Sequence, residues 1–417
     1  MNDCHCNTFS KSAADAIATI RGLFPNDLHN RLYLVGGSVR DHVMGHPVCD
    51  VDLVTDVPGE QLVELHFQHV QGKSAPPIYF KSNSRFGKLD VTVLEHGQSL
   101  EDDLLRRDFR CNAIAMTLDG ILIDPLGGLY DIPNKQLIPC SSQSIIDDPI
   151  RMFRAFRFES FGWRIAPELD TAIKERSWEV QLATISVERF SREMFKAMSG
   201  DSPDIFFSQM IGQSVGRCYL PEIFQMQEVP AGPAKYHGED SVFTHSLNAL
   251  RRMSVFANDP VVRLAAFFHD LGKLTTPQEM LPSHIGHDKA GEPFSRAVCG
   301  RLKLPASCVR VVAATNALHL VAGRWHELKP TTKLKLARRS LKRGIAPWLP
   351  LIVSADRNID NPMPGWELAC QSAGMSATDL GITSEALDEI PPSERQRLIE
   401  QFQMKHYMNM ITRAGDD

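Results

Sequence analysis

The spacing of apolar residues along the chain changes near residue 140. Before that point short apolar runs alternate with turns rich in Gly, Pro and Asp, which predicts strands. The predicted strands are Leu32–Val35, Val51–Val54, Lys88–Leu94, Ala113–Leu118 and Ile121–Asp124. An amphipathic helix over residues 10–24 precedes them, and helical spacing continues from residue 141 to the end. We therefore expect a small α/β head with a mixed sheet, followed by an all-α remainder.

Composition narrows the class of protein further. The 417 residues are 43% hydrophobic and 23% charged, as in soluble globular proteins with several domains. We find no apolar run of about 18 residues and no signal-peptide pattern at the start, so we expect a cytoplasmic protein with no membrane contact. The nine cysteines include no Cys-x-x-Cys pair, which argues against a disulfide framework or a structural zinc site.

The net charge of −5 means that any RNA binding must come from local patches. The segment Lys329–Arg343 is the best such patch, because six of its basic residues crowd one predicted helix. These residues are Lys333, Lys335, Arg338, Arg339, Lys342 and Arg343. A solvated helix face is an equally good interpretation of this segment.

Two aspartates, Asp50 and Asp52, alternate on a predicted strand and so project from one face. Their carboxylates should lie roughly 6 to 7 Å apart and would repel one another unless a cation such as Mg²⁺ joined them. Gly36 and Gly37 follow the preceding strand. Glycine has no side chain to keep a phosphate away from the backbone, and the N-terminus of the following helix offers free N–H groups to it. Together these features predict a Mg²⁺–nucleotide site, although each alone also occurs as an ordinary turn or strand. Asp90 is either a third acidic group near the metals or a polar residue at the sheet edge, the interpretation that we favour.

Two later segments add arginines to this picture. The first contains Arg106, Arg107, Asp108 and Asn112, a pattern that also fits a capped helix end with a solvated face.

The second segment contains Asp148 and Pro149, which predict a helix start with Asp148 as the cap and Pro149 at the first position. Arg151, Arg154 and Arg157 follow at intervals of three residues and so line one helix face. Guanidinium groups in such an array suit a triphosphate or a base edge. A purely capping role for Asp148 is the alternative.

A third group of residues has the composition of a metal site. His245, His269, Asp270 and Asp356 offer imidazole and carboxylate ligands for one or two divalent transition metals. Such metals generate a hydroxide nucleophile at neutral pH. Further ligands or phosphate contacts are expected from His284, His287 and His319.

The order strand, Gly-Gly-x-Val-Arg-Asp, helix and Asp-x-Asp strand resembles the active-site signature of DNA polymerase β-like nucleotidyltransferases. Its form is that of class II tRNA nucleotidyltransferases and bacterial poly(A) polymerases. The resemblance implies nucleotide binding by Gly36, Gly37, Arg40, Arg106, Arg107, Asp108, Asn112, Asp148, Arg151, Arg154 and Arg157. It also implies that Asp50 and Asp52 hold Mg²⁺ and that Asp148 and Arg151 read the base of CTP or ATP. This chain has Asp147 where the family usually has Glu.

The histidine and aspartate set resembles an HD-domain phosphohydrolase, which implies that His245, His269, Asp270 and Asp356 bind a divalent metal such as Ni²⁺ or Mn²⁺. Enteric-type tRNA nucleotidyltransferases carry such a domain, with phosphatase and 2′,3′-cyclic phosphodiesterase activities. Poly(A) polymerases with a similar head typically do not. The implied divisions are an N-terminal extension (1–30), a catalytic head (31–140), a neck (141–200), a body (201–240), an HD domain (241–360) and a C-terminal tail (361–417).

We therefore expect an enzyme that adds nucleotides from CTP and ATP to the 3′ end of tRNA. Only residues 94–99 link the third predicted strand to the segment that begins at Leu100. Complete CCA-adding relatives have a longer loop at this place. This short link favours addition of the two cytidines, with a separate enzyme adding the A. The alternatives are a poly(A) polymerase, an HD phosphohydrolase with an inactive head, and a non-catalytic RNA-binding protein.

Overall fold

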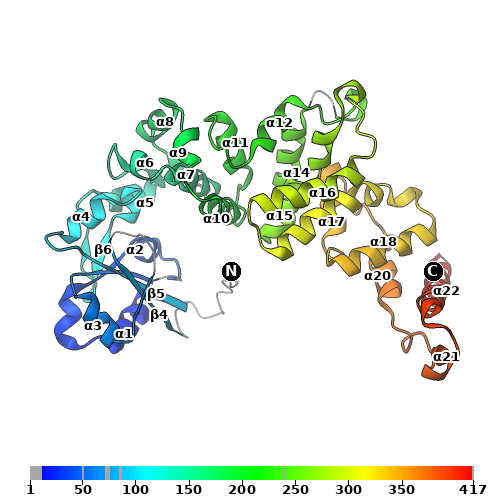
Figure 1. Ribbon diagram of the computed structural model, residues 1–417, viewed down its shortest axis with the longest axis horizontal. Helices are drawn as coiled ribbons and strands as arrows, with labels where there is room; N and C mark the ends of the chain where they lie inside the picture. The colour runs from blue at the N-terminus through cyan, green and yellow to red at the C-terminus, as the bar shows by residue number, and fades with distance from the viewer. Residues whose placement is uncertain (1–11, 49–50, 71–75, 84–86, 238–239, 416–417) are drawn as a thin grey trace. The chain divides into compact units, whose positions relative to one another are not determined.

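The computed structural model describes residues 12–48, 51–70, 76–83, 87–237 and 240–415. The chain forms two compact units, Met1–Gln181 and Leu182–Asp417 (Figure 1). Within the described ranges every strand lies in the first unit, and the second unit is built from helices. This confirms the expected mixed α/β head and all-α remainder. The finer divisions at residues 140, 200, 240 and 360 stay predictions.

The first unit is organised by a seven-stranded mixed sheet of order β3-β4-β5-β2-β1-β6-β7. Its strands are β1 (Leu32–Val35), β2 (Val51–Thr55), β3 (Gln68–His69), β4 (Ile78–Asn83), β5 (Gly87–Val93), β6 (Ala115–Thr117) and β7 (Leu122–Ile123). Strands β2 and β5 are parallel, and the other neighbouring pairs are antiparallel. Buried apolar residues such as Leu34, Leu53 and Val91 place the core against the central strands.

Helices and short turns complete the first unit. They are α1 (Ala13–Leu23), η1 (Asn26–Arg31), α2 (Gly37–Val43), α3 (Gly59–Glu64), α4 (Leu100–Leu105), η2 (Arg110–Asn112), α5 (Gly128–Asn134), α6 (Ser144–Asp147), α7 (Ile150–Ser160), α8 (Pro167–Lys174) and α9 (Glu179–Leu182). A separate parallel pair joins β8 (Gln136–Leu137) to β9 (Arg164–Ile165). The predicted N-terminal helix is thus present as α1, closed by a capping box between Ser12 and Asp15.

The start of α7 differs from the expectation. The helix begins at Ile150 with Pro149 at the N-cap, and the proline side chain makes no capping hydrogen bond. Asp148 stands one residue earlier, in the bend between α6 and α7. Proline has a fixed φ and no N–H, so it begins a helix without needing an acceptor from the preceding side chain. The prediction that Asp148 caps this helix is therefore wrong.

The second unit contains the remaining helices. They are α10 (Val187–Ala197), α11 (Asp204–Gly212), α12 (Pro221–Glu228), α13 (Ala234–His237), α14 (Val242–Phe256), α15 (Pro260–Phe267), η3 (Leu271–Thr275), η4 (Gln278–Met280), α16 (His287–Arg301), α17 (Ala306–Gly323), η5 (Trp325–Glu327), α18 (Pro330–Arg343), α19 (Leu349–Arg357), α20 (Trp366–Gly374), α21 (Ser384–Asp388) and α22 (Pro392–Gly415). One apolar cluster runs from Met253 in α14 to Tyr407 in α22, so the C-terminal helices share a core with α14, α15 and α17–α19.

Helix α17 is long and apolar enough to cross a membrane by length and composition alone, and 56% of it is buried inside the protein. It packs against α15, α16, α18 and α19. Buried residues such as Val312, Leu318 and Ala322 account for its hydropathy. The helix therefore has the packing of a core helix.

A buried arginine ties several segments of the second unit together. Arg263 in α15 is 2% exposed. Its guanidinium donates to the backbone oxygens of Met198, Gly200, Ser254 and Ala257 and to Asn258 Oδ1. Each of these acceptors belongs to a loop or helix end that no regular hydrogen-bond ladder satisfies.

We predict that Arg263→Met lowers the free energy of unfolding by about 3 kcal/mol or more, because buried acceptors lose their donor. Urea denaturation followed by circular dichroism measures this change. Arg310→Met is the matched control, since Arg310 is exposed and contacts no described residue through a hydrogen bond or ion pair. The control should change the unfolding free energy by no more than about 0.5 kcal/mol. Equal effects of the two substitutions would contradict this role.

Candidate active sites

The turn between β1 and α2 brings a carboxylate and a guanidinium to one stretch of backbone. Gly36 has φ +72°, a conformation that favours glycine. A Cβ at this position would lie 3.0 Å from Arg107 Nη1 and 3.6 Å from Asp52 Oδ2. Asp52 pairs with Val35 across the antiparallel β1–β2 ladder, directly beside the turn. The fold thus brings Gly36, Asp52 and Arg107 together, while Asp50 lies outside the described residues.

A second acidic residue lies beside Asp52. The parallel register of β2 and β5 pairs Asp52 with Asp90, so their side chains project from the same face of neighbouring strands. Lys88 Nζ lies 2.7 Å from Asp90 Oδ1 and offsets part of its charge. The interpretation of Asp90 as a sheet-edge residue is wrong, because β4 pairs with the other side of β5.

A buried carboxylate that the sequence analysis missed positions the two adjacent arginines. Asp103 in α4 is 1% exposed and forms ion pairs with both Arg106 and Arg107. Arg107 donates to Asp103 Oδ2 from Nε at 3.0 Å and from Nη2 at 2.8 Å. The third nitrogen of this guanidinium, Nη1, remains directed toward the Gly36 turn. The spacing Asp-x-x-Arg-Arg, which places the acid one helical turn before the arginines, was the available signal.

Asp108 is the centre of a polar chain between α2 and α7. Its carboxylate accepts hydrogen bonds from Asn112 Nδ2 and the Phe109 N–H, and Arg154 Nη2 lies 2.7 Å from its Oδ2. Asn112 Oδ1 in turn accepts from Arg40 Nη1 at 2.6 Å. Burial alone would raise the pKa of Asp108, but Arg154, Asn112 and the Phe109 N–H outweigh it and lower the pKa.

The other arginines of α7 take different positions. Arg151 donates from Nη2 to the Arg106 carbonyl at 2.6 Å and from Nη1 to the Arg107 carbonyl at 3.0 Å. It also contacts the backbone and hydroxyl of Ser144. The Arg157 guanidinium lies 4.5 Å from the centre of the Phe158 ring. Arg151 and Arg154 therefore converge on residues 106–108, whereas Arg157 stacks on an aromatic ring.

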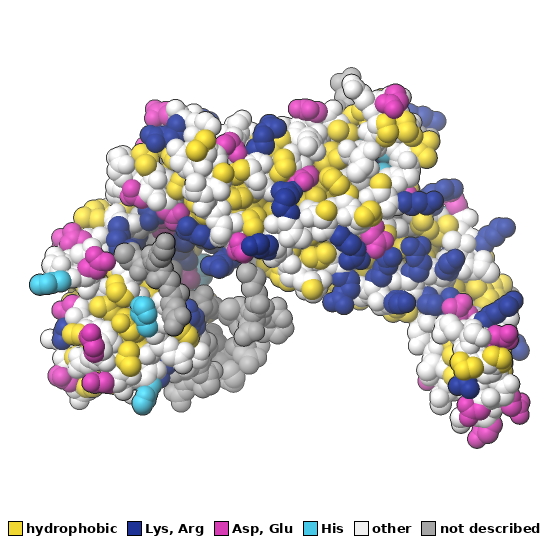
Figure 2. Space-filling model, in the orientation of Figure 1, with side chains coloured by type: hydrophobic (Ala, Val, Ile, Leu, Met, Phe, Trp, Pro, Cys, Tyr) yellow, Lys and Arg dark blue, Asp and Glu magenta, His cyan; other side chains and the backbone are white. Residues whose placement is uncertain are grey.

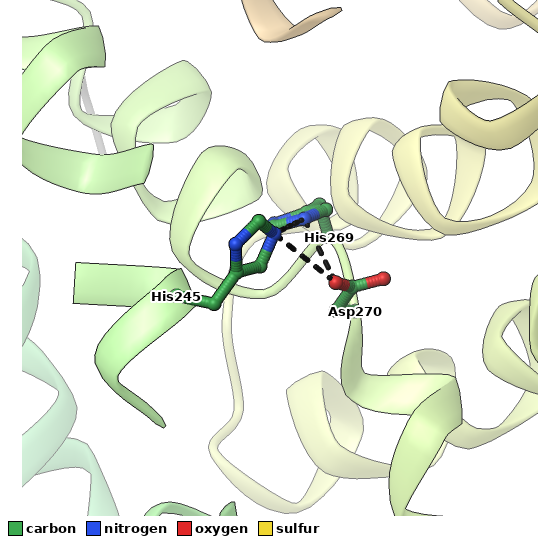
Figure 3. Close-up of side chains that lie close together, drawn as sticks. All are labelled: His245, His269 and Asp270. Atoms are coloured by element: carbon green, nitrogen blue, oxygen red, sulfur yellow. Dashed lines mark hydrogen bonds and ion pairs between the residues drawn. The ribbon is translucent and has the colours of Figure 1, made fainter. Parts of the chain in front are cut away.

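The second site joins residues from two helices and a turn of the second unit. His245 comes from α14, His269 and Asp270 follow α15, and Asp356 lies in α19. His245 Nε2 lies 3.2 Å from His269 Nε2, and His269 Nε2 lies 3.0 Å from Asp270 Oδ2. Figure 3 shows the two imidazoles and the Asp270 carboxylate directed toward one another. Asp356 Oδ1 closes the group, 3.0 Å from His245 Nε2.

Asp270 also faces a second pair of histidines. Its Oδ1 lies 3.4 Å from His287 Nε2 and 3.3 Å from His319 Nε2. Asp270 therefore belongs to two groups of possible metal ligands, one with each of its oxygens. His284, a third expected partner, instead contacts Thr276 and the Pro230 carbonyl.

The geometry of these groups fits a divalent metal. The Nδ1 atoms of His269, His287 and His319 contact backbone carbonyls, which directs each Nε2 toward Asp270. Two ligand atoms that are each about 2.1 Å from a tetrahedral metal lie about 3.4 Å apart, and the separations here run from 3.0 to 3.5 Å. Asp270 Oδ1 and His287 Nε2 are buried and make no hydrogen bond with any described residue.

The charges within this group are strongly coupled. Burial disfavours charge on His269, but Asp270 and Asp356 outweigh it and raise the pKa of His269 to about 10. The same contacts, with Lys273 Nζ 2.6 Å from Asp270, hold the pKa of Asp270 well below its usual range. His245, Asp270 and Asp356 line a cavity of about 960 Å³, with Arg252 and Arg357 among its other walls. This cavity has the size of a small-ligand site and cationic groups suited to a phosphate.

We predict that Arg154→Met destabilises the fold more at pH 7 than at pH 4.5. In the natural protein the lowered pKa of Asp108 stabilises the fold above the unfolded value of about 4, and this contribution is lost as the pH falls through the folded value. Without Arg154, burial raises the pKa of Asp108, so the variant loses stability as the pH rises. Thermal unfolding at the two pH values measures the difference. Asp108→Asn combined with Arg154→Met is the control, and its deficit should be independent of pH.

Comparison with known proteins identifies both regions. Residues 32–138 match the family described as the Poly A polymerase head domain, and residues 242–344 match the HD domain. The chain is 35% identical over 327 residues to the Multifunctional CCA protein of Tolumonas auensis, covering 74% of this chain and 79% of that protein. It is 34% identical over 324 residues to the Multifunctional CCA protein of Shewanella denitrificans, covering 73% and 78%.

Solved structures share the fold. The Bacillus stearothermophilus CCA-adding enzyme in complex with CTP aligns with a TM-score of 0.63 at 22% identity, covering 96% of this chain and 98% of that one. The Thermotoga maritima CCA-adding enzyme complexed with tRNA aligns with a TM-score of 0.60 at 19% identity, covering 90% and 86%. From the head, the HD domain and the extent of these relatives, we conclude that the chain belongs to the multifunctional CCA protein family of bacterial class II CCA-adding enzymes.

Proposed function

We propose that the first unit transfers cytidine nucleotides from CTP to the 3′ end of tRNA and releases pyrophosphate. The convergence of Asp52 and Arg107 on the Gly36 turn carries this proposal. It places a metal-binding carboxylate and a phosphate-binding guanidinium around backbone that has no side chain to exclude a ligand. The relatives' membership in the CCA-adding family supplies the substrate class.

The donor set suits Mg²⁺, which prefers oxygen ligands from carboxylates and phosphates. Asp50 and Asp52 would hold it, with Asp90 as a neighbouring carboxylate. When bound, two Mg²⁺ ions would supply this chemistry, one activating the RNA 3′-hydroxyl and the other stabilising the leaving pyrophosphate. Arg107, held by Asp103, is positioned beside the Gly36 turn to bind the triphosphate charge.

Base selection is proposed to involve Asp148 and Arg151. The terminal nitrogens of Arg151 also hold the carbonyls of Arg106 and Arg107. A base that engages Arg151 would therefore act on the same backbone that carries the triphosphate-binding arginines. This connection supports a role for α7 in aligning base and phosphate together. The Asp108–Arg154 pair then fixes α7 against this segment.

We predict that Asp52→Asn lowers the rate of CMP incorporation into tRNA by at least about 10³-fold, because it removes a metal-binding charge. Incorporation of labelled CMP into tRNA lacking its CCA end measures the rate. Metal-dependent hydrolysis of a 2′,3′-cyclic nucleotide by the second unit should be unchanged. The reciprocal variant Asp270→Ala should lose this hydrolysis and keep CMP incorporation. Retained incorporation by a folded Asp52→Asn protein would refute the assignment.

The link between β5 and α4 supports addition of cytidines only. Residues 94–99 form a short turn that is anchored at both ends. The Leu94 N–H donates to the Thr55 carbonyl at 2.8 Å, and Ser99 caps α4 in a capping box with Asp102. A link so short and anchored has little freedom to reshape the site between a C and an A. We therefore propose that a separate A-adding enzyme completes the CCA end.

Sequencing the 3′ ends of products tests this specificity. With CTP and ATP both present, tRNA lacking CCA should end in CC, and tRNA already ending in CC should remain unchanged. A complete CCA end would show that another segment performs the switch. Long A-tails on arbitrary RNA would instead indicate a poly(A) polymerase.

For the second unit we propose a metal-dependent phosphohydrolase. His245, His269, Asp270 and Asp356 would hold one divalent transition metal such as Ni²⁺ or Mn²⁺, which when bound would supply a hydroxide nucleophile at neutral pH. A second ion fits between the other oxygen of Asp270 and the two histidines of α16 and α17. Asp270 Oδ1 and His287 Nε2, which face the proposed metal and make no hydrogen bond with described residues, support this assignment.

A tRNA-processing role also supports our expectation of a cytoplasmic location.

A further inference from the structure

Helix α18 carries six basic residues and no acidic ones, in a chain whose net charge is −5. Three of the six have structural partners. Arg338 contacts Gln403 and Glu400 on α22, and Arg343 forms an ion pair with Glu292 on α16. The Lys333 ammonium lies 4.9 Å from the centre of the Trp325 ring. These three side chains hold α18 against its neighbours.

The other three basic residues face solvent. Lys335, Arg339 and Lys342 are exposed, and no described residue forms a hydrogen bond or an ion pair with them. Their spacing of four and three residues places them in one stripe along the helix. Figure 2 shows Lys and Arg side chains gathered over α18. Like charges left together without counter-charges repel one another, so such a stripe is a site for an anionic partner.

The surroundings of the stripe extend its charge. Lys335 lines a groove of about 390 Å³ between α18 and α22, together with Arg338 and the exposed Arg397. Glu400 also lines this groove, but Arg338 is paired with it. The positive surface therefore continues from the stripe toward Arg397.

The apolar side of α18 determines which anionic partner fits. Leu334, Leu336 and Ala337 are buried in the core of the second unit, so this side of the helix is unavailable to a lipid bilayer. Membrane-surface helices need an exposed apolar face in addition to their charge. What remains is a row of cations spanning roughly 10 Å, at 1.5 Å per residue. Such a row matches an array of backbone phosphates.

We propose that Lys335, Arg339 and Lys342 form a docking face on the second unit for the phosphate backbone of the RNA substrate. The choice of tRNA as this RNA rests on the proposed function, whereas the contact itself does not depend on catalysis. The face binds phosphates through charge alone and reads no sequence. Its contribution is therefore to hold the RNA while the first unit acts on its 3′ end.

The test is the salt dependence of tRNA binding, measured by filter binding with the full-length protein. Lys335→Gln/Arg339→Gln/Lys342→Gln should weaken binding about tenfold or more at low salt and make the slope of log K against log salt shallower by about 2. Lys289→Gln/Lys405→Gln/Arg413→Gln removes the same charge from other exposed positions of the second unit and should leave both values unchanged. The charge-preserving Lys335→Arg/Arg339→Lys/Lys342→Arg should also bind like the natural protein.

Kinetics separate this face from the nucleotide site. The Gln variant should raise the KM for tRNA and leave the KM for CTP and the kcat at saturating tRNA unchanged. If the chain transferred no nucleotide at all, the proposed function would fail while the binding measurement still decided the docking face. Natural affinity and slope in a folded Gln variant, or equal losses in the charge-matched control, would overturn the proposal.

Discussion

The first unit depends on two buried carboxylates, Asp103 and Asp108, each of which is paired with arginines. A carboxylate removed from water is stable only when cations and hydrogen-bond donors surround it. Asp103 draws Arg106 and Arg107 to the end of α4, and Asp108 draws Arg154 from α7. The arginines around the Gly36 turn are therefore fixed before any nucleotide binds. Such preorganisation means that binding a triphosphate requires little rearrangement of the protein.

The second unit treats a buried carboxylate differently. The Lys273 amine lies at one oxygen of Asp270, and the other oxygen faces the imidazoles of His287 and His319 at distances beyond a strong hydrogen bond. An imidazole is neutral or charged according to its surroundings, whereas a guanidinium is always charged. The Asp270 group therefore offers the donor types of a metal site, and the Asp108 group does not. The same residue type is structural in one unit and a metal ligand in our proposal for the other.

Much of the architecture was predictable, because the turn glycines and the strand periodicity are local signals. The strand β4 was missed, since Ile78–Asn83 combines aromatic and polar residues without clear alternation. Asp90 lies inside the sheet because β4 pairs with β5 on the side away from β2. Asp103 was missed for a different reason. In sequence an acid among Glu101, Asp102 and Arg106 looks like a solvated helix face, and only the packing of α4 shows that it is buried.

The partners of the basic residues of α18 bear on a question that the sequence left open. The sequence allowed two interpretations of these residues, a solvated helix face and a phosphate contact. In the structure neither interpretation covers Arg338, Arg343 and Lys333, because these three hold the helix in place. The packing that these three provide fixes the direction of the remaining stripe on a rigid helix. A fixed row of charges loses less entropy on binding than flexible side chains on a loop. The structural pairs thus make the unpaired cations more effective as a binding surface.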